Sequence, residues 1–179
     1  MTEEIGLATK VLPIVVHPNE ILRQVAENVT EFDDELQTLV VDMVTTTVSH
    51  DGIGLAAPQV GISKRIIVIV IEDTPLALIN PFIVEGKGKV RSKEGCLSIP
   101  GYFDDVERFN EITVSYQTSQ GEVKESNAKG LLAVVVQHEI DHLNGKMFTD
   151  YLSPFKQKRA KDKIKKSVKK LRKLGKQFV

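Results

Sequence analysis

The segment His138-Glu139-Ile140-Asp141-His142 carries the side chains with the clearest capacity for chemistry. Residues four positions apart lie one turn apart on the same face of an α-helix, so both imidazoles can reach a single point. Two imidazole nitrogens at that spacing are suitable ligands for a zinc- or iron-sized ion. Glu139 can stand beside a water molecule on that ion and accept its proton. The segment therefore predicts a metal-dependent hydrolase.

A chance match on the protein surface is the alternative interpretation of this segment. It is disfavoured because the residues just before the pair, Leu131 to Val136, are apolar and predict a buried helix. An exposed pair of histidines would not normally end such a helix.

A stable metal site needs a further protein ligand, and two common protease sets are excluded. The three-histidine set requires a histidine where the chain has Phe148, and the thermolysin-like set requires a later glutamate, which the chain lacks. The remaining candidate is Cys96, the only cysteine. A lone cysteine is often a plain core residue, although a thiolate with two imidazoles and one open position is also a workable catalytic set.

Hydrophobic periodicity predicts an α+β arrangement in which helices bracket antiparallel strands. Helices are expected near residues 19–25, 32–51, 131–144 and 153–174. Strands are expected over residues 11–16, 65–71, 76–84, 112–117 and 122–127, and an extended piece from Leu97 is interrupted at Pro100-Gly101. We expect one domain, with residues 1–152 as the catalytic body and 153–179 as a C-terminal basic helix that belongs to it.

The composition is that of a soluble protein, with 179 residues of which 41% are hydrophobic and 27% are charged. The longest apolar run, Ile66 to Ile71, is too short to span a membrane. The segment from Met1 to Lys10 lacks the apolar core of a signal peptide, and a single cysteine is compatible with a reducing compartment. We therefore expect a cytoplasmic protein with no membrane partner.

The net charge of zero conceals a strong asymmetry along the chain. Between Lys156 and Lys176 lie 12 of the 24 Lys and Arg residues but only one of the 24 acidic residues, Asp162. This pattern fits either a solvated helix docked on the acidic body or a surface that attracts phosphate groups. An apolar stripe also runs along the predicted helix, formed by Ala160, Ile164, Val168, Leu171 and Leu174.

Three segments, taken in order, resemble the signature motifs of bacterial type I peptide deformylases. They are Gly52-Ile53-Gly54-Leu55-Ala56-Ala57-Pro58-Gln59, Glu94-Gly95-Cys96-Leu97-Ser98 and Gln137-His138-Glu139-Ile140-Asp141-His142. The resemblance implies antiparallel strands partly wrapped around a central metal-binding helix, followed by a C-terminal basic helix. It also implies an enzyme that removes the formyl group from the initiator methionine of nascent polypeptides and releases formate.

The resemblance further assigns roles to individual residues. Cys96, His138 and His142 would bind one divalent ion, physiologically Fe²⁺, with Zn²⁺, Ni²⁺ or Co²⁺ as possible substitutes, whereas ligand softness alone would favour Zn²⁺. Metal-bound water would be the nucleophile, and Glu139 would take its proton and pass it to the departing amine. The side-chain amide of Gln59 and the backbone N–H of Leu97 would stabilise the oxyanion.

For several further residues, a functional role competes with a purely structural one. Gly54 could bind or make room for an extended substrate, or could be a turn glycine. Glu94 could bind a cation such as Arg108 and fix the strand beside the metal ligand, or could be a solvated charge. Core packing is likewise the alternative for the residues that could line a methionine pocket, namely Ile53, Leu131, Val134 and Val135.

The expected partners are an N-formylmethionyl nascent peptide and, through the basic helix, the ribosome, with the enzyme itself a monomer. His17 and His50 are expected to be structural or surface residues. Many bacterial members carry an arginine a few residues after Cys-Leu-Ser, where this chain has Phe103 and Asp104. This departure leaves open how the substrate is bound beyond its methionine.

Two other classes of protein remain as alternatives. One is a metallopeptidase or an amidase for another small acyl group, which the missing third protease ligand disfavours. The other is a catalytically silent, ribosome-associated binding protein, which the intact Glu139, Gln59 and ligand set disfavour.

Overall fold

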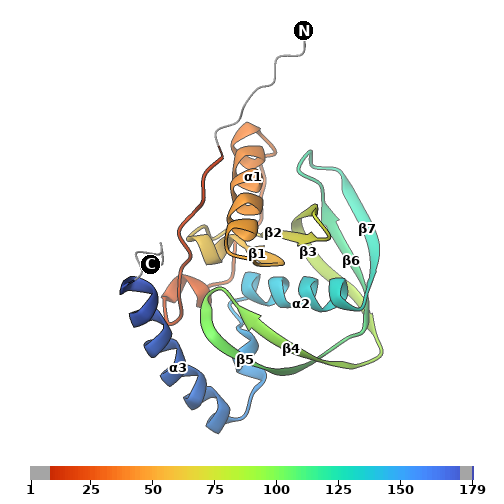
Figure 1. The fold of residues 1–179 in the computed structure, drawn as a ribbon. Coiled ribbons are helices and arrows are strands. Elements are labelled where there is room, and N and C mark those ends of the chain that lie inside the picture. Colours follow the sequence, from red (N-terminus) through yellow and green to blue (C-terminus); the bar gives the residue numbers. More distant parts are fainter. Residues whose placement is uncertain (1–8, 174–178) are drawn as a thin grey trace.

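Strand β2, Ile66–Ile71, is apolar throughout because both faces of the main sheet are covered. Ile67 and Ile69 belong to one core cluster, which includes residues of helix α2, Leu131–Leu143. Ile66 and Val68 belong to another, which includes residues of helix α1, Asp34–Ser49. Because side chains alternate along a strand, the sheet lies between the two helices. Figure 1 shows this arrangement in the computed structural model, which describes residues 9–173 and 179.

Five antiparallel strands form the main sheet, in the order β1-β2-β3-β6-β7. The other four are β1 Gly54–Ala56, β3 Thr74–Lys87, β6 Glu111–Gln117 and β7 Val123–Lys129. A second, two-stranded sheet pairs β4, Val90–Cys96, with β5, Ile99–Arg108. A hydrogen bond between His138 and Glu94 joins α2 to this second sheet, so the helix lies between the two sheets (Figure 1).

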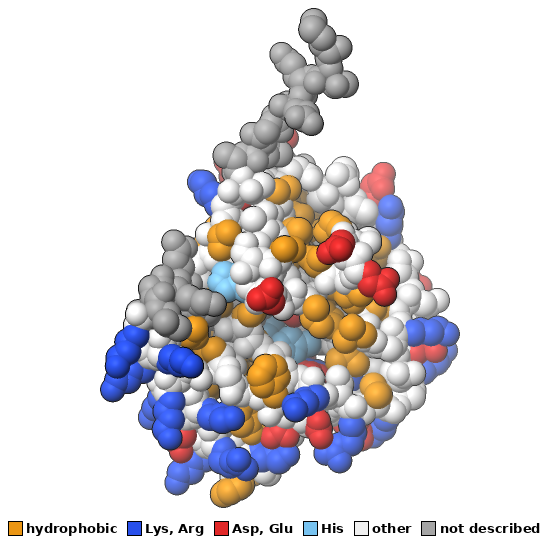
Figure 2. Space-filling view, in the orientation of Figure 1, with side chains coloured by type: hydrophobic (Ala, Val, Ile, Leu, Met, Phe, Trp, Pro, Cys, Tyr) orange, Lys and Arg blue, Asp and Glu red, His pale blue; other side chains and the backbone are white. Residues whose placement is uncertain are grey.

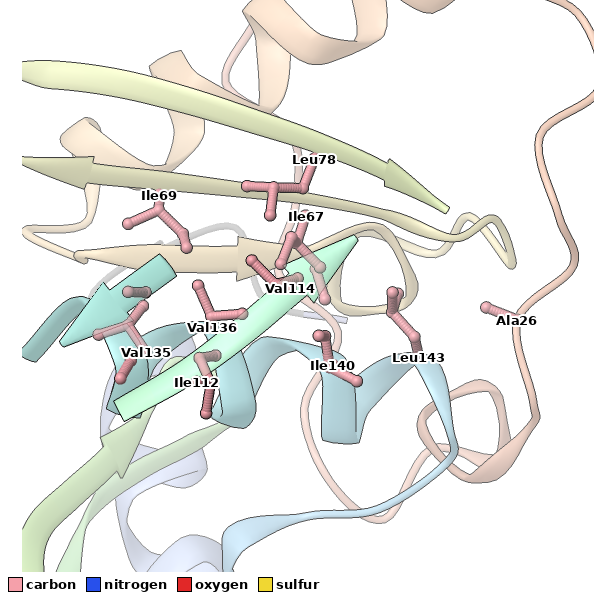
Figure 3. Close-up of a cluster of buried hydrophobic side chains, with 13 residues drawn as sticks. Ala26, Ile67, Ile69, Leu78, Ile112, Val114, Val135, Val136, Ile140 and Leu143 are labelled. Atoms are coloured by element: carbon pink, nitrogen blue, oxygen red, sulfur yellow. The ribbon is translucent and has the colours of Figure 1, made fainter. Parts of the chain in front are cut away.

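Helix α2 is held in place mainly by apolar packing against the main sheet. Figure 3 shows Val135, Val136, Ile140 and Leu143 of α2 facing side chains of strands β2, β3 and β6. Asn144 caps the C-terminal end of the helix, and Gly145 follows with φ of 69°. A Cβ at Gly145 would overlap the backbone carbonyl of Arg23, so glycine is required there.

The last helix, α3, Pro154–Lys173, packs along β5. Its buried residues Ala160 and Ile164 share a core cluster with Tyr102 and Val106 of β5. Short 3₁₀-helices complete the described fold: η1 Glu20–Arg23, η2 Ala57–Val60 and η3 Phe148–Tyr151. Among the described residues, no helix combines the length and the apolar character needed to cross a membrane.

The α+β class, the antiparallel strands around a central helix and the C-terminal helix are confirmed. The predicted helices over 32–51 and 131–144 and the hairpin of 112–117 with 122–127 also match the structure closely. The predicted end of the last helix, Leu174, lies outside the described residues, as do Lys176 and most of the segment from Met1 to Lys10.

Three local predictions are wrong. Residues 11–16 are extended but belong to neither sheet, because their backbone instead bonds elsewhere, for example from Val15 N–H to the carbonyl of Gln59. Strand β5 continues through Pro100-Gly101, where Gly101 takes a φ of 78° rather than ending the strand. The extended piece expected from Leu97 begins only at Ile99, as β5, because Cys96 ends a strand, β4, that the periodicity does not reveal, and Leu97 lies in the turn between them.

Replacing Val136 by Ala tests whether this packing holds the central helix. The buried side chain contacts the sheet, so its truncation should lower the free energy of unfolding by about 2 kcal/mol. The matched change Val123→Ala, at an exposed position on β7, should cost less than about 0.5 kcal/mol. Urea denaturation of both variants measures the difference, and equal costs would contradict the packing described here.

Candidate active site

Three side chains with metal-binding atoms converge at the centre of the molecule. His138 and His142 lie one turn apart on α2, and their Nε2 atoms are 3.2 Å apart. Cys96 arrives from the end of β4, where the pairing with β5 slips after Glu94, and its Sγ lies 3.3 Å from Nε2 of His142. The three ligand atoms all lie within 4.8 Å of one another. The structure therefore brings together the three residues that the sequence analysis expected to bind a metal.

The chemistry of this donor set fits a divalent metal ion. Both imidazoles are buried, and Nδ1 of His142 has no hydrogen-bond partner among the described residues. One sulfur and two imidazole nitrogens that converge on one point suit zinc- or iron-type ions and leave a coordination position open.

A chain of polar contacts fixes the orientation of the His138 ring. Its Nδ1 lies 2.7 Å from Glu94 Oε2, which directs Nε2 toward Cys96 and His142. Arg108 donates to both oxygens of Glu94, from Nε at 2.7 Å and from Nη2 at 3.0 Å. Arg108 also donates from Nη1 to Asp141 Oδ2 at 2.6 Å, and Tyr151 donates to the other oxygen of Asp141 at 3.1 Å. Glu94 is thus a buried, paired carboxylate and not a solvated charge.

The charges in this network shift the pKa values of its members. Burial raises the pKa of Glu94, but hydrogen bonds from His138 and Arg108 outweigh it and lower the pKa overall. Burial lowers the pKa of His138, yet its contacts with Cys96 and Glu94 hold that pKa well above the ordinary value. Burial and the charge of His138 both lower the pKa of His142. An ionised Glu94 therefore faces the imidazole at neutral pH.

Glu139 is a buried carboxylate beside the histidine pair. Its Oε2 atom has no hydrogen-bond partner among the described residues. Burial raises the pKa of Glu139 to about 7, although the nearby charge of His138 opposes that shift. Gly54 lies against it in β1, where an added Cβ would overlap the Glu139 carboxylate and the side chain of Val135. Gly54 is therefore a strand residue that leaves room for Glu139, and the simple turn interpretation is wrong.

Gln59 and Leu97 lie beside Cys96 rather than on α2. The Oε1 atom of Gln59 accepts a hydrogen bond from the backbone N–H of Ala56 at 2.8 Å. This contact orients the amide, so that Nε2 points toward Cys96 Sγ and Ser98 Oγ, both at 3.3 Å. Leu97 follows Cys96 directly, in the turn that joins β4 to β5.

A cleft of about 540 Å³ is lined by Gln59, Cys96, Leu97, His138 and Glu139. Figure 2 shows histidine atoms in a hollow surrounded by hydrophobic side chains. All four residues expected to line a methionine pocket border the cleft: Ile53 and Leu131 are exposed at its rim, whereas Val134 and Val135 are buried in its wall. Besides the residues already named, the cleft is lined by Ser49, His50, Asp51, Gly52, Ser92, Lys93, Gly95, Pro100, Gly101, Phe103 and Leu171.

Some contributors to the site were not expected from the sequence. Asp141 and Tyr151 complete the contacts around Arg108, and Leu171 brings the last helix to the cleft. Asp141 could have been predicted from the sequence, because a position three residues after His138 faces the same side of a helix. His50, expected to be a structural or surface residue, caps α1 and also lines the cleft. His17 lies elsewhere, in a separate groove beside α3.

Comparison with known proteins agrees with this geometry. The family model described as polypeptide deformylase matches residues 11–158. A peptide deformylase of Alkalilimnicola ehrlichii is 46% identical over 162 residues, which cover 88% of this chain and 91% of that protein. The crystal structure of a peptide deformylase from Legionella pneumophila superimposes with a TM-score of 0.87 and 44% identity, over 90% of this chain and 97% of that one.

A second solved structure was determined with a peptide bound. It is a Met-Ala-Ser-bound class I type b peptide deformylase from Acinetobacter baumannii, with a TM-score of 0.78 and 35% identity, over 80% of this chain and 99% of that one. The family match spans most of this chain and includes every residue of the Cys-His-His cluster. The chain therefore belongs to the polypeptide deformylase family.

Proposed function

We propose that this protein is a metal-dependent enzyme that hydrolyses the formyl group from the initiator methionine of nascent polypeptides and releases formate. Its family already makes it a hydrolase that acts on formylated nascent peptides. The observation that carries the finer proposal is the convergence of Cys96, His138 and His142 at one point, where Cys96 and His138 line a cleft together with the buried Glu139.

In this proposal, Cys96, His138 and His142 hold one divalent ion. Such an ion, when bound, lowers the pKa of water toward neutrality and polarises a carbonyl oxygen. Thiolate and imidazole ligands alone would favour Zn²⁺, and the choice of Fe²⁺ as the ion in the cell rests on the resemblance to bacterial deformylases. The same donor set would accept Zn²⁺, Ni²⁺ or Co²⁺ in its place.

Glu139 is the proposed general base and acid. It would accept a proton from the attacking water and deliver it to the amine of the departing peptide, which is otherwise a poor leaving group. Its pKa of about 7 supports this role, because the side chain can then both accept and return a proton near neutral pH.

Gln59 and Leu97 are the proposed donors to the negative charge that develops on the formyl oxygen. The amide of Gln59 is held by Ala56, so its Nε2 is oriented before substrate arrives. The backbone N–H of Leu97 is the second proposed donor. Preorganised donors of this kind contribute about 3 kcal/mol each to stabilising the transition state.

Glu94 and Arg108 are proposed to position His138 rather than to touch the substrate. The paired carboxylate fixes which nitrogen of His138 faces the ion and strengthens that nitrogen as a ligand. Asp141 and Tyr151 hold Arg108 in turn. The contacts that position His138 therefore extend from the second sheet to η3, which contains Tyr151.

The peptide part of the substrate would lie extended between two strand edges. Strand β1 ends the main sheet, and β4 pairs with β5 alone among the described strands, so both can offer backbone groups to a peptide. Gly54 of β1 and Gly95 of β4 both line the cleft. Ile53, Leu131, Val134 and Val135 would surround the methionine side chain. The Met-Ala-Ser peptide in the related structure supports a substrate of this kind.

The basic helix is proposed to bring the enzyme to the ribosome. The described lysines of α3 are exposed, apart from Lys156, which pairs with Asp104, and Figure 2 shows positive charge gathered along the α3 side. Ribosomal RNA is the polyanion that such a surface would attract. We further propose a cytoplasmic monomer in which residues 1–152 form the catalytic body and 153–179 the helix of one domain.

Replacing Glu139 by Gln removes the base with little change in shape. Formate release from formyl-Met-Ala-Ser by anaerobically prepared Fe²⁺ or Ni²⁺ protein should fall about 10²- to 10⁴-fold in kcat, with the bound metal retained. Acetyl-Met-Ala-Ser should not be cleaved. Glu125→Gln, at an exposed position on β7, is the matched control and should keep full activity. Near-normal turnover by the Glu139 variant would refute its role, and cleavage of the acetyl peptide would indicate a different amidase.

Replacing Glu94 by Gln tests the support of His138. The loss of the carboxylate facing the imidazole should raise the Kd for metal about 10- to 100-fold, measured by competition with a chelator. Glu107→Gln, whose side chain pairs with Lys89 on the surface of β5, should leave the Kd unchanged. An unchanged Kd in a folded Glu94 variant would show that the contact does not tune the site.

Charge reversal on α3 tests ribosome binding. Changing the exposed Lys165, Lys169 and Lys170 to Glu should weaken co-sedimentation with ribosomes at least about tenfold, and the binding of the unchanged protein should fall steeply with added salt. Reversal of three other exposed lysines, Lys87, Lys89 and Lys124, gives a control with the same net charge. Equal losses in both triple variants would contradict a site on α3.

A further inference from the structure

The two proposed oxyanion donors come from different parts of the fold. Gln59 lies in η2, which directly follows β1 of the main sheet, and Leu97 lies in the turn between β4 and β5 of the second sheet. We infer that the extended residues 14–17 hold these two donors at a fixed spacing, and that Val15 is a positioning residue for the oxyanion site. The inference rests on the proposed function and extends it to residues outside the cleft.

One edge of residues 14–17 bonds to both of the elements that carry the donors. The backbone N–H of Val15 donates to the carbonyl of Gln59 at 2.8 Å, and the backbone N–H of His17 donates to the carbonyl of Ser98 at 2.9 Å. Ser98 directly follows Leu97. Alternate residues of an extended chain lie about 7 Å apart and direct their N–H groups to the same side. The segment is therefore a spacer between η2 and the β4–β5 turn.

The other edge of the segment and its side chains hold the spacer in place. The N–H of Val16 donates to the main-chain oxygen of Val179 at 2.8 Å, and the N–H of Val179 donates to the carbonyl of Ile14 at 2.9 Å. Ile14 is fully buried in a cluster that includes residues of β1 and η2. Val15 and Val16 are buried in a different cluster, which includes Ile99 of β5. The segment is thus anchored in the packing of both sides that it joins.

The side chain of Gln59 cannot supply this spacing by itself. Among the described residues, the direct hydrogen bonds from η2 to the β4–β5 connection both come from its Nε2, which lies 3.3 Å from Cys96 Sγ and from Ser98 Oγ. This nitrogen carries two N–H bonds, so one of these contacts is given up when Nε2 donates to the formyl oxygen. The bond from Val15 uses only the backbone carbonyl of Gln59, and it is therefore kept throughout the reaction.

Loss of this spacer should affect the rate of the chemical step and not the binding of substrate. Oxyanion donors act on charge that develops in the transition state, so their displacement lowers kcat and leaves KM nearly unchanged. A misplacement of about 1 Å can slow a reaction on the order of 10²-fold. Loss of the Val15 bond alone, with the His17 bond and the packing retained, should cost about tenfold.

Replacing Val15 by Pro tests the inference, because proline lacks the N–H and still fits an extended backbone. With metal-loaded, full-length protein and formyl-Met-Ala-Ser, kcat should fall about tenfold and KM should change less than about twofold. The Kd for metal, measured by competition with a chelator, should stay unchanged. Val11→Pro, at an exposed position of the same extended stretch, is the matched control and should keep the wild-type kcat.

A double-mutant cycle with Gln59→Ala shows whether Val15 acts through the amide. Gln59→Ala alone should lower kcat at least about 10²-fold, and adding Val15→Pro should then lower it by only about twofold or less. A merely structural role predicts the same additional loss with and without the Gln59 amide. That result would overturn the inference, as would an unchanged kcat in a folded Val15→Pro protein or a loss of metal affinity in that variant.

Val179→Pro gives a second probe at a position that is 60% exposed. It removes the bond to Ile14 on the other edge of the segment and should lower kcat about threefold, again only while the Gln59 amide is present. If Val15→Pro does not fold, an unchanged kcat in Val179→Pro overturns the inference. Absence of formate release by the unchanged protein would instead overturn the proposed function, so the two failures are distinguishable.

Discussion

The hydrogen bond between His138 Nδ1 and Glu94 Oε2, at 2.7 Å, joins the central helix to the second sheet at the centre of the molecule. Its geometry fixes which nitrogen of the imidazole ring points toward Cys96 and His142. Glu94 can stand there only because Arg108 neutralises it, and Arg108 is held in turn by Asp141 from the same helix as His138. The contacts form a closed circuit between α2 and β4–β5, so a shift of either sheet would disturb the metal-binding cluster.

This circuit explains how a helix as apolar as α2 can carry two histidines and two acids. Burial of charged groups is costly unless each group is paired or hydrogen-bonded. Apolar residues of α2 pack on the main sheet, whereas His138 and Asp141 face the polar network. Glu139 and His142 are exceptions, since one oxygen of Glu139 and Nδ1 of His142 have no hydrogen-bond partner among the described residues. An unpartnered carboxylate in a cleft is suited to handling a proton.

Local patterns in the sequence predict the central helix and its histidine pair well, because a spacing of four residues directly implies a shared helix face. The nearby Glu139 follows from the same pattern. Strand β4 could not be predicted in this way, since Val90–Cys96 contains charged residues and a glycine and becomes a strand by pairing with β5. Whether Cys96 lies near the histidines depends on that pairing, so sequence spacing alone left the cysteine as either a ligand or a core residue.

Contacts between distant segments account for the other differences. Residues 11–16 are β-prone, but they join neither sheet. The backbone N–H of Val15 donates to the carbonyl of Gln59 instead. Leu171 is part of an apolar stripe that predicts a docked helix, yet only the docking of α3 on β5 shows that the stripe ends at the cleft. Periodicity identifies a face that must be covered, and tertiary packing determines what covers it.

The most direct test of this account is the electronic absorption spectrum of the protein loaded with Co²⁺. Binding of one Co²⁺ per chain, with a thiolate-to-cobalt charge-transfer band that disappears in Cys96→Ala, is the predicted result. Stoichiometric binding without that band, or a band unaffected by the loss of Cys96, would contradict a site formed by Cys96, His138 and His142.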